Sequence, residues 1–251
     1  MAIIKSLQNP YIKMLKKQMK QKSLLFLDSP KLIAEALKSD LQLYSLLIDY
    51  EKTKSLEKFC FLKNFKDKIV TTTPEIIKHF SNVKTPQGVI GIFEVQKTNL
   101  KAPSGNFLVL DCIQDAGNVG TLLRSALGAG FKDIYLLNCA QISNMKTIRS
   151  SMGAIFKLNV YQTTKIEFLE FFKNNISYSL YSADLDGKNI FDFNFKFPCG
   201  IALGNEGRGL SNEIKKLSAD TISIPIDTNL ESLNVAVAGS IIMFQIKNFN
   251  L

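Results

Sequence analysis

The stretch 107–130, "FLVLDCIQDAGNVGTLLRSALGAG", decides the fold class predicted for most of the chain. It opens with "FLVLD", a continuous apolar run of the kind found in strands that are buried on both faces. The following residues are typical of a turn and then a helix. A buried strand that leads through a turn into a helix is the repeating unit of parallel sheets.

The alternation of strand and helix continues to the end of the chain. Further strands are predicted at 133–137, 158–162, 177–184, 198–204 and 221–226. Helices are predicted at 165–175, within 205–217 and over 232–247, and the segment 145–156 is helical or irregular. The predicted class is therefore α/β, with a mostly parallel sheet covered on both faces. In such sheets ligands bind beyond the carboxyl ends of the strands.

The first hundred residues predict a smaller α/β module. Helices are expected at 9–20, 29–37 and 73–80, and strands at 24–28, 41–49 and 87–95. Ser29 and Thr73 each precede a proline and are expected to cap helices. The polar stretch that follows favours a linker. The predicted organisation is 1–96 for the first domain, 97–106 for the linker and 107–251 for the second domain.

Charge separates these two parts. The net charge of the 251-residue chain is +9. Residues 1–100 contain 17 Lys and 9 Asp or Glu, which gives +8, whereas residues 101–251 contain 14 Lys or Arg and 13 Asp or Glu, which gives +1. A basic module indicates a polyanion such as RNA, and the alternative is a merely solvated Lys-rich face. The candidate RNA contacts here are Lys13, Lys16, Lys17 and Lys20, on the helix predicted at 9–20.

Several classes of function are disfavoured. No apolar run is long enough for a membrane span, and the run at the start of the sequence is too short for a signal peptide, so a cytoplasmic location is expected. Cys60, Cys112, Cys139 and Cys199 are too far apart in sequence for a CxxC pair, and no metal site is expected. The one histidine, His79, lies beside apolar residues and is expected to be a packing residue rather than a catalyst.

Three polar, glycine-containing loops fall at predicted strand ends: 111–130, 203–211 and 224–239. Parallel strands would bring them to one edge of the sheet. None contains the G-x-G-x-x-G pattern of dinucleotide-binding proteins or the Gly-Lys-Ser/Thr of a P-loop, so an oxidoreductase is disfavoured. Taken singly, Asn118 between Gly117 and Gly120 is explained equally well as a helix cap in a tight turn.

Together the loops resemble the SpoU (TrmH-like) family of RNA ribose methyltransferases, of the SPOUT class. The family's three motifs are similar to "DAGNVGTLLRSALGAG" at 115–130, "LGNEGRGL" at 203–210 and "IPIDTNLESLNVAVA" at 224–238, and "KTIRSSMGAIF" at 146–156 also fits. The resemblance is close over about 107–247. Residues 1–95 look like the RNA substrate-binding α/β domain that such enzymes carry.

The resemblance implies a C-terminal domain with a trefoil knot, which binds S-adenosyl-L-methionine largely through backbone groups and forms a homodimer. It also implies transfer of a methyl group to a ribose 2′-hydroxyl in structured RNA, either rRNA or tRNA. A catalytically inactive RNA-binding homologue is the alternative. The implied cofactor-binding residues are Leu203, Gly204, Asn205, Gly209, Ile224, Ile226, Ser232 and Leu233.

The implied catalytic residues are Arg124, Asn118, Glu206, Ser232 and Asn234. Arg124 would bind phosphate and stabilise the alkoxide, since a guanidinium is a poor base. Glu206 would accept the proton or support a loop, and Asn118 would orient its neighbours. Ser232 is expected to cap the last helix and Asn234 to begin it, while both face the site. Arg149 and Arg208 are further candidates for contacts with RNA phosphates.

Overall fold

The computed structural model describes residues 3–21, 23–56, 61–95 and 99–249. The chain divides into two compact units, Met1–Lys97 and Thr98–Leu251. The boundary falls at the start of the predicted linker. The roles assigned to the two parts, RNA binding and methyl transfer, stay predictions.

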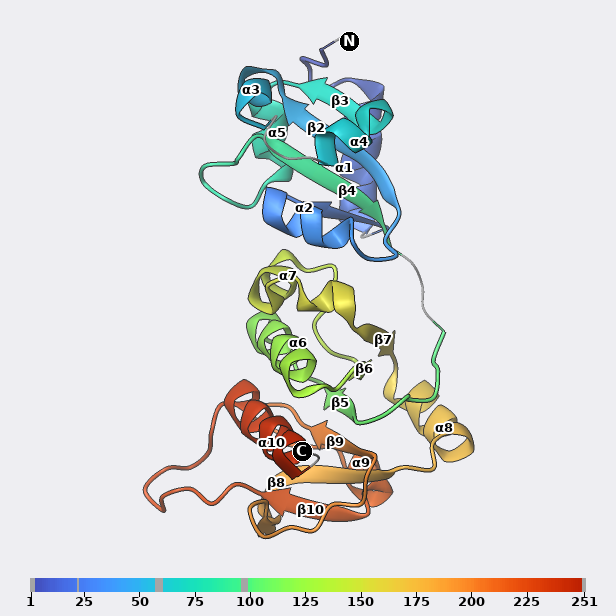
Figure 1. Cartoon of the computed structure of the whole chain (residues 1–251), viewed down its shortest axis with the longest axis vertical. Coiled ribbons are helices and arrows are strands. Elements are labelled where there is room, and N and C mark those ends of the chain that lie inside the picture. The colour runs from blue at the N-terminus through green and yellow to red at the C-terminus, as the bar shows by residue number, and fades with distance from the viewer. Residues whose placement is uncertain (1–2, 22, 57–60, 96–98, 250–251) are drawn as a thin grey trace. The chain divides into compact units, whose positions relative to one another are not determined.

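The first unit contains a mixed four-stranded sheet with the order β1-β4-β2-β3 (Figure 1). The strands are β1 (Leu24–Leu27), β2 (Leu43–Asp49), β3 (Ile69–Thr72) and β4 (Val89–Glu94). β4 is antiparallel to β1 and β2, and β3 is parallel to β2. The helices and short helical turns are α1 (Pro10–Gln21), α2 (Pro30–Ala36), η1 (Tyr50–Lys52), α3 (Thr53–Leu56), α4 (Phe61–Asn64), η2 (Lys66–Lys68) and α5 (Pro74–Phe80).

The predicted helices and strands of this unit are present, and β3 with the short helical turns before it was not predicted. Ile12 and Leu15 of α1 are fully buried among strand side chains, which explains the helical apolar spacing. Ser29 and Thr73 stand at the N-cap positions, but neither side chain accepts a capping hydrogen bond. Proline at the first helical position leaves one fewer N–H to satisfy there.

The second unit is built on six parallel strands in the order β10-β8-β9-β5-β6-β7. The strands are β5 (Phe107–Asp111), β6 (Asp133–Leu137), β7 (Asn159–Thr163), β8 (Ser179–Asn189), β9 (Cys199–Leu203) and β10 (Asp220–Ser223). The helices are α6 (Ala116–Ala129), α7 (Met145–Ser151), η3 (Ala154–Lys157), α8 (Lys165–Asn175), α9 (Asn212–Leu217) and α10 (Val235–Phe249). The predicted α/β class and the parallel sheet are confirmed.

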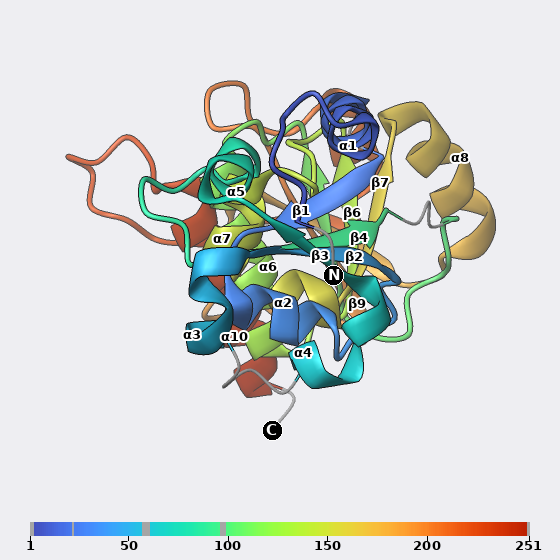
Figure 2. The same ribbon diagram turned by 90° about the horizontal axis from the view of Figure 1, so that it is seen from above.

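Alternate side chains of β5 pack on the two opposite faces of this sheet. Leu108 and Leu110 pack in a cluster with side chains of α6 and α10, whereas Phe107 and Val109 pack with side chains of α8 and α9. Figures 1 and 2 draw α6 and α8 on opposite sides of the strands. Since side chains alternate along a strand, a sheet covered on both faces requires the continuous apolar run from which the strand was predicted.

Residues near the end of the predicted linker belong to the second unit. The Tyr135 hydroxyl donates to the carbonyl of Lys101 at 2.6 Å. The backbone N–H and hydroxyl of Ser104 both donate to Oδ2 of Asp133 at 2.9 Å. Asp133 is buried, so these bonds satisfy a carboxylate that would otherwise be costly to bury. The polar residues that suggested a linker therefore form hydrogen bonds with β6 of the second unit.

The end of the chain differs from the prediction in two boundaries. β10 ends at Ser223, before the predicted Ile226, and α10 begins at Val235 rather than at 232. The segment between them projects away from the sheet in both views (Figures 1 and 2). Among the helices that the structure describes, none has the length and apolarity needed to cross a membrane.

Candidate active site

The site lies where the strand order of the second sheet changes direction. β5 lies between β6 and β9. From β5 the chain continues to β6 and β7 on one side, while β9 has β8 and β10 on its other side. Parallel sheets open a crevice at the carboxyl ends of strands where successive connections diverge. The helix that follows β5 and the loop that follows β9 both begin at this edge.

Asp115 begins the helix after β5. Its side chain accepts a hydrogen bond from the backbone N–H of Asn118 at 2.9 Å, which is N-cap geometry. The cap is therefore Asp115, and the interpretation of Asn118 as a helix cap is wrong. Because Asp115 satisfies the backbone here, the amide side chain of Asn118 is available for contacts beyond its own helix.

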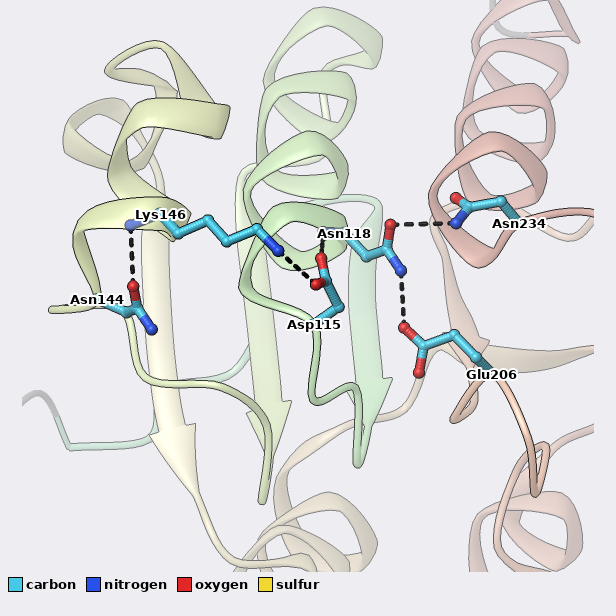
Figure 3. A network of polar contacts seen from close by, with 6 residues as sticks. All are labelled: Asp115, Asn118, Asn144, Lys146, Glu206 and Asn234. Atoms are coloured by element: carbon cyan, nitrogen blue, oxygen red, sulfur yellow. Dashed lines mark hydrogen bonds and ion pairs between the residues drawn. The ribbon is translucent and has the colours of Figure 1, made fainter.

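Asn118 joins three segments that are far apart in the sequence (Figure 3). Its Nδ2 donates to Oε1 of Glu206 at 2.8 Å, and its Oδ1 accepts from Nδ2 of Asn234 at 3.2 Å. Glu206 lies in the loop after β9, and Asn234 immediately precedes α10. Three of the five catalytic candidates thus form one polar network, with one residue from each of the three motif loops.

The contacts of Asn234 decide which amide atoms in this network donate and which accept. Oδ1 of Asn234 accepts from the N–H groups of Ala236 at 2.9 Å and Val237 at 3.4 Å, so this oxygen caps α10. Its Nδ2 must then face Asn118, whose oxygen accepts and whose nitrogen donates to Glu206. Each amide is oriented by its neighbour, and Glu206 acts as acceptor. Asn234 is the cap that was expected at Ser232.

The loop after β9 is held by its own turn and by β5. A Cβ atom built on Gly204 would lie 2.2 Å from the carbonyl carbon of Gly209, so the two strands of the turn can approach this closely only with glycine. Asn205 Nδ2 donates to the carbonyl of Cys112 at 3.0 Å. The N–H of Ser211 donates to Oδ2 of Asp111 at 2.8 Å. Glu206 therefore projects from a turn that is fixed on both sides.

Asp115 and Lys146, which were not predicted as site residues, lie beside the network. Nζ of Lys146, from the loop and helix after β6, pairs with Oδ2 of Asp115 at 2.5 Å. The hydrogen bond from Lys146 is the main reason that the pKa of Asp115 lies below its ordinary value, and the bond from the Asn118 N–H is the second reason. The spacing of Asp115 three residues before Asn118 is a capping signal that could have been used. Lys146 carried no signal, because its partner is 31 positions away.

The other two catalytic candidates lie outside this network. Arg124 and Ser232 are exposed. Among the residues that the structure describes, neither side chain has a hydrogen-bond or ion-pair partner. Arg124 lies six residues beyond Asn118 on α6, about 9 Å along the helix axis at 1.5 Å per residue. Ser232 lies in the projecting segment before α10.

The remaining candidates fall into two groups. Of the cofactor-binding candidates, Leu203 is buried at the end of β9, Gly204, Asn205 and Gly209 form the turn, and Ile224, Ile226 and Leu233 are partly buried in the segment after β10. Of the RNA-binding candidates, Arg149 is partly buried on α7, Arg208 is exposed in the loop after β9, and Lys13, Lys16, Lys17 and Lys20 lie on α1.

Thiol and imidazole chemistry does not fit the described site. Burial raises the pKa of Cys139 to about 12, and burial with the neighbouring Asp111 raises the pKa of Cys112. Both thiols are therefore protonated at neutral pH and are poor nucleophiles. His79 belongs to the first unit, where it is exposed on α5 rather than packed in the core as expected. Burial and the nearby Lys16 and Lys20 lower its pKa.

Solved structures share this architecture. The rRNA methyltransferase from Sinorhizobium meliloti matches 100% of this chain and 98% of its own with a TM-score of 0.85 at 22% identity. The SpoU methyltransferase AviRb from Streptomyces viridochromogenes, solved with AdoMet, matches 94% of each chain with a TM-score of 0.80 at 23% identity. At these identities the likeness concerns the fold alone.

Curated relatives match over part of their length. RlmP of Bacillus subtilis, a 23S rRNA (guanosine(2553)-2′-O)-methyltransferase, is 27% identical over 66% of this chain and 67% of its own. The mitochondrial rRNA methyltransferase 3 of Xenopus tropicalis is 26% identical over 87% of this chain and 68% of its own. The chain thus spans about two thirds of the length of these relatives.

The family model described as the SpoU rRNA Methylase family matches residues 105–244. That segment is more than half of the chain and includes all three loops that meet at Asn118. The predicted resemblance is confirmed: the chain belongs to the SpoU rRNA methylase family.

Proposed function

We propose that this chain transfers a methyl group from S-adenosyl-L-methionine to a ribose 2′-hydroxyl in structured RNA, either rRNA or tRNA. The observation that carries the proposal is the network of Glu206, Asn118 and Asn234, which joins the three family motifs at the strand-order switch. RlmP, whose name specifies 2′-O transfer to a guanosine, supports the choice of the ribose hydroxyl.

The turn after β9 and the segment after β10 fit the proposed cofactor. Glycine at position 204 lets the backbone of this turn lie close to Gly209, and main-chain groups of the turn are proposed to contact the cofactor. Ile224 and Leu233 are half-buried apolar neighbours for an adenine ring. Leu203, Asn205, Gly209, Ile226 and Ser232 complete the proposed binding set. When bound, S-adenosyl-L-methionine supplies an electrophilic methyl group on a sulfonium sulfur.

Glu206 is the proposed proton acceptor. A ribose hydroxyl is a weak nucleophile until its proton leaves, and a positioned carboxylate can accept that proton. The bond from Asn118 fixes one oxygen of Glu206, and Asn234 fixes Asn118. The two asparagines therefore act by orientation, and a fixed acceptor needs less reorganisation during the reaction.

Arg124 is the proposed electrostatic group. A guanidinium is a poor base, but it can bind the neighbouring phosphate and stabilise the developing alkoxide. Its exposed position, with no described partner, leaves its donors available to substrate. Ser232 is a proposed ribose contact from the projecting segment.

RNA binding is proposed for basic residues of both units. Lys13, Lys17 and Lys20 are exposed on α1, and Lys16 is partly exposed. Arg149 and Arg208 are proposed phosphate contacts near the site. Contacts of this kind position RNA through its backbone and carry no sequence information directly.

A trefoil knot is proposed for the end of the second unit. After the edge strand β10, the chain returns so that Ala236 and Ile242 of α10 pack in the cluster that contains Leu122 and Leu203. This return past β8 and β9 supports the knotted path that the family resemblance implies. A crystal structure with residues 199–249 traced continuously would test it.

A homodimer is proposed through the same region. Val237 and Phe244 are about half exposed on α10, seven residues apart and so on one face of the helix. Phe244→Glu is expected to convert a dimer into a monomer in sedimentation velocity measurements. A variant that sediments as the wild type does would contradict this choice of interface. The expected cytoplasmic location stays a prediction.

The activity is tested with labelled S-adenosyl-L-methionine and total RNA, followed by nuclease mapping of the labelled nucleotide. We expect transfer to one ribose position, and loss of transfer in Glu206→Gln, which keeps the shape of the side chain but accepts a proton poorly. Glu213→Gln is the matched control, because Glu213 pairs with Lys165 away from the network. Intact cofactor binding without transfer to any RNA would favour the inactive RNA-binding alternative.

A further inference from the structure

We propose that Asp115 and Lys146 are positioning residues that hold Asn118 between Glu206 and Asn234. The inference rests on the proposed function for its kinetic consequences, although the geometry stands independently. Neither residue belongs to the set assigned above to the reaction, the cofactor or RNA. With Asn144, they form the remaining part of the polar network in Figure 3.

The carboxylate of Asp115 uses its two oxygens for two different tasks. Oδ1 accepts the N–H of Asn118 at 2.9 Å, and Oδ2 pairs with Nζ of Lys146 at 2.5 Å. The first bond fixes the backbone of the residue whose side chain bridges the network. The second bond fixes the rotamer of the carboxylate that makes the first.

Lys146 is itself held in place. Its backbone N–H donates to Oδ1 of Asn144, the cap of α7, at 2.9 Å. α7 lies directly against α6, since a Cβ atom built on Gly120 would lie 2.4 Å from the carbonyl oxygen of Thr147. The ammonium group therefore reaches Asp115 from a helix whose distance to α6 is fixed.

The position of Lys146 is electrostatically unfavourable for its own helix. It is the second residue of α7, and a cation near a helix N-terminus opposes the helix dipole. The negative charge of Asp115, at the neighbouring N-terminus of α6, offsets this unfavourable interaction of the Lys146 ammonium group. Gly117 leaves space for the pair: a Cβ atom there would lie 2.8 Å from Oδ1 of Asp115 and 3.1 Å from Cε of Lys146. The arrangement thus depends on three residues acting together.

The experiment compares kcat, KM for RNA and cofactor affinity in Asp115→Ala, Asp115→Asn and Lys146→Met. We expect kcat to fall on the order of tenfold in Asp115→Ala, because the network loses its backbone anchor. Asp115→Asn should recover most of kcat, since its amide oxygen can still accept the Asn118 N–H. Lys146→Met should lower kcat about two- to fivefold, as expected for an exposed ion pair.

The matched control is Thr164→Ala, which removes the N-cap of α8 on the opposite face of the sheet. It should lower thermal stability about as much as Asp115→Ala does, without the loss of kcat. An equal loss of kcat in both variants would reduce Asp115 to a structural cap and overturn the proposal. A rise in KM for RNA with unchanged kcat in Lys146→Met would assign that lysine to RNA contact instead.

A second measurement is independent of activity. The side-chain NH₂ resonances of Asn118, assigned by their loss in Asn118→Ala, should show slow exchange in the wild type and fast exchange in Asp115→Ala. If the wild type transfers no methyl group but this difference is observed, the proposed function fails and the positioning role stands. If the Asn118 resonances are the same in Asp115→Ala and the wild type, the positioning role fails.

Discussion

The basic helix α1 of the first unit and the polar network of the second unit hold their side chains in opposite ways. In the second unit, Asn118 is a short side chain with a partner on each side, Glu206 and Asn234. On α1 of the first unit, Lys13 and Lys17 are long and exposed, and neither has a hydrogen-bond or ion-pair partner among the described residues. This difference matches the two proposed roles, because catalysis requires groups held in a fixed geometry, whereas electrostatic attraction to RNA requires only positive charge.

The largest effect is expected at Arg124. Arg124→Ala should lower kcat on the order of 10³-fold, because it removes the group that stabilises the alkoxide and binds phosphate. Cofactor affinity, measured by calorimetry, should stay nearly unchanged. Arg208→Ala, in the loop after β9, is the comparison variant and should affect RNA affinity more than kcat. A large loss of cofactor binding in Arg124→Ala would show that its role is misassigned.

The next effect tests the network directly. Asn118→Ala should lower kcat about 10²-fold in single-turnover assays, since Glu206 loses its fixed donor. Asn229→Ala provides the control, because the side chain of Asn229, as far as the described residues go, bonds within its own loop, to Asp227. Equal rates in these two variants would contradict the claim that the network orients Glu206.

A smaller effect is expected on α1. Lys13→Ala with Lys17→Ala should weaken RNA binding several-fold and reduce the slope of log K against log salt by about 1.5, two contacts at roughly 0.7 to 0.9 each. The rate of methyl transfer at saturating RNA should not change. Lys31→Ala with Lys38→Ala, on and just beyond α2, is the matched control. An unchanged slope in the α1 variant would assign its lysines to a solvated face.

The smallest effect concerns pH. Lys146→Met should raise the pKa of Asp115, because the bond from that lysine is the main cause of its low value. Since the pKa is lowered on folding, the carboxylate stabilises the fold above its unfolded pKa, and this contribution disappears as pH falls through the folded value. The variant should therefore differ most from wild type in urea unfolding near pH 7, and least in acid.

A carboxyl titration by NMR measures the same shift. The pKa of Asp227 is lowered by bonds from Asn229 rather than by a lysine, so it serves as an internal reference that should not move. An Asp115 titration midpoint that is identical with and without Lys146 would show that the ion pair does not form in solution.

The sequence predicted the elements of the second unit closely and their ends less well. The apolar run of β5 and the helix after it were both found, because burial on two faces leaves a pattern that does not depend on distant partners. In the first unit β3 was missed, since it has only four residues and is partly exposed. The end of β10 and the start of α10 were misplaced, because "IPI" at 224–226 continues the apolar run of the strand and Ser232 is a typical capping residue, although neither belongs to a strand or helix.

By itself, the sequence determined the α/β class, the order of the strands in the second unit and the three motif loops, all of which follow from local pattern and from family likeness. Only the tertiary structure decided that Asn118 bridges Glu206 and Asn234, and that Lys146 pairs with Asp115 beside them. The reason is physical. These bonds connect residues 31, 88 and 116 positions apart, and a hydrogen bond depends on distance and direction that local spacing does not contain.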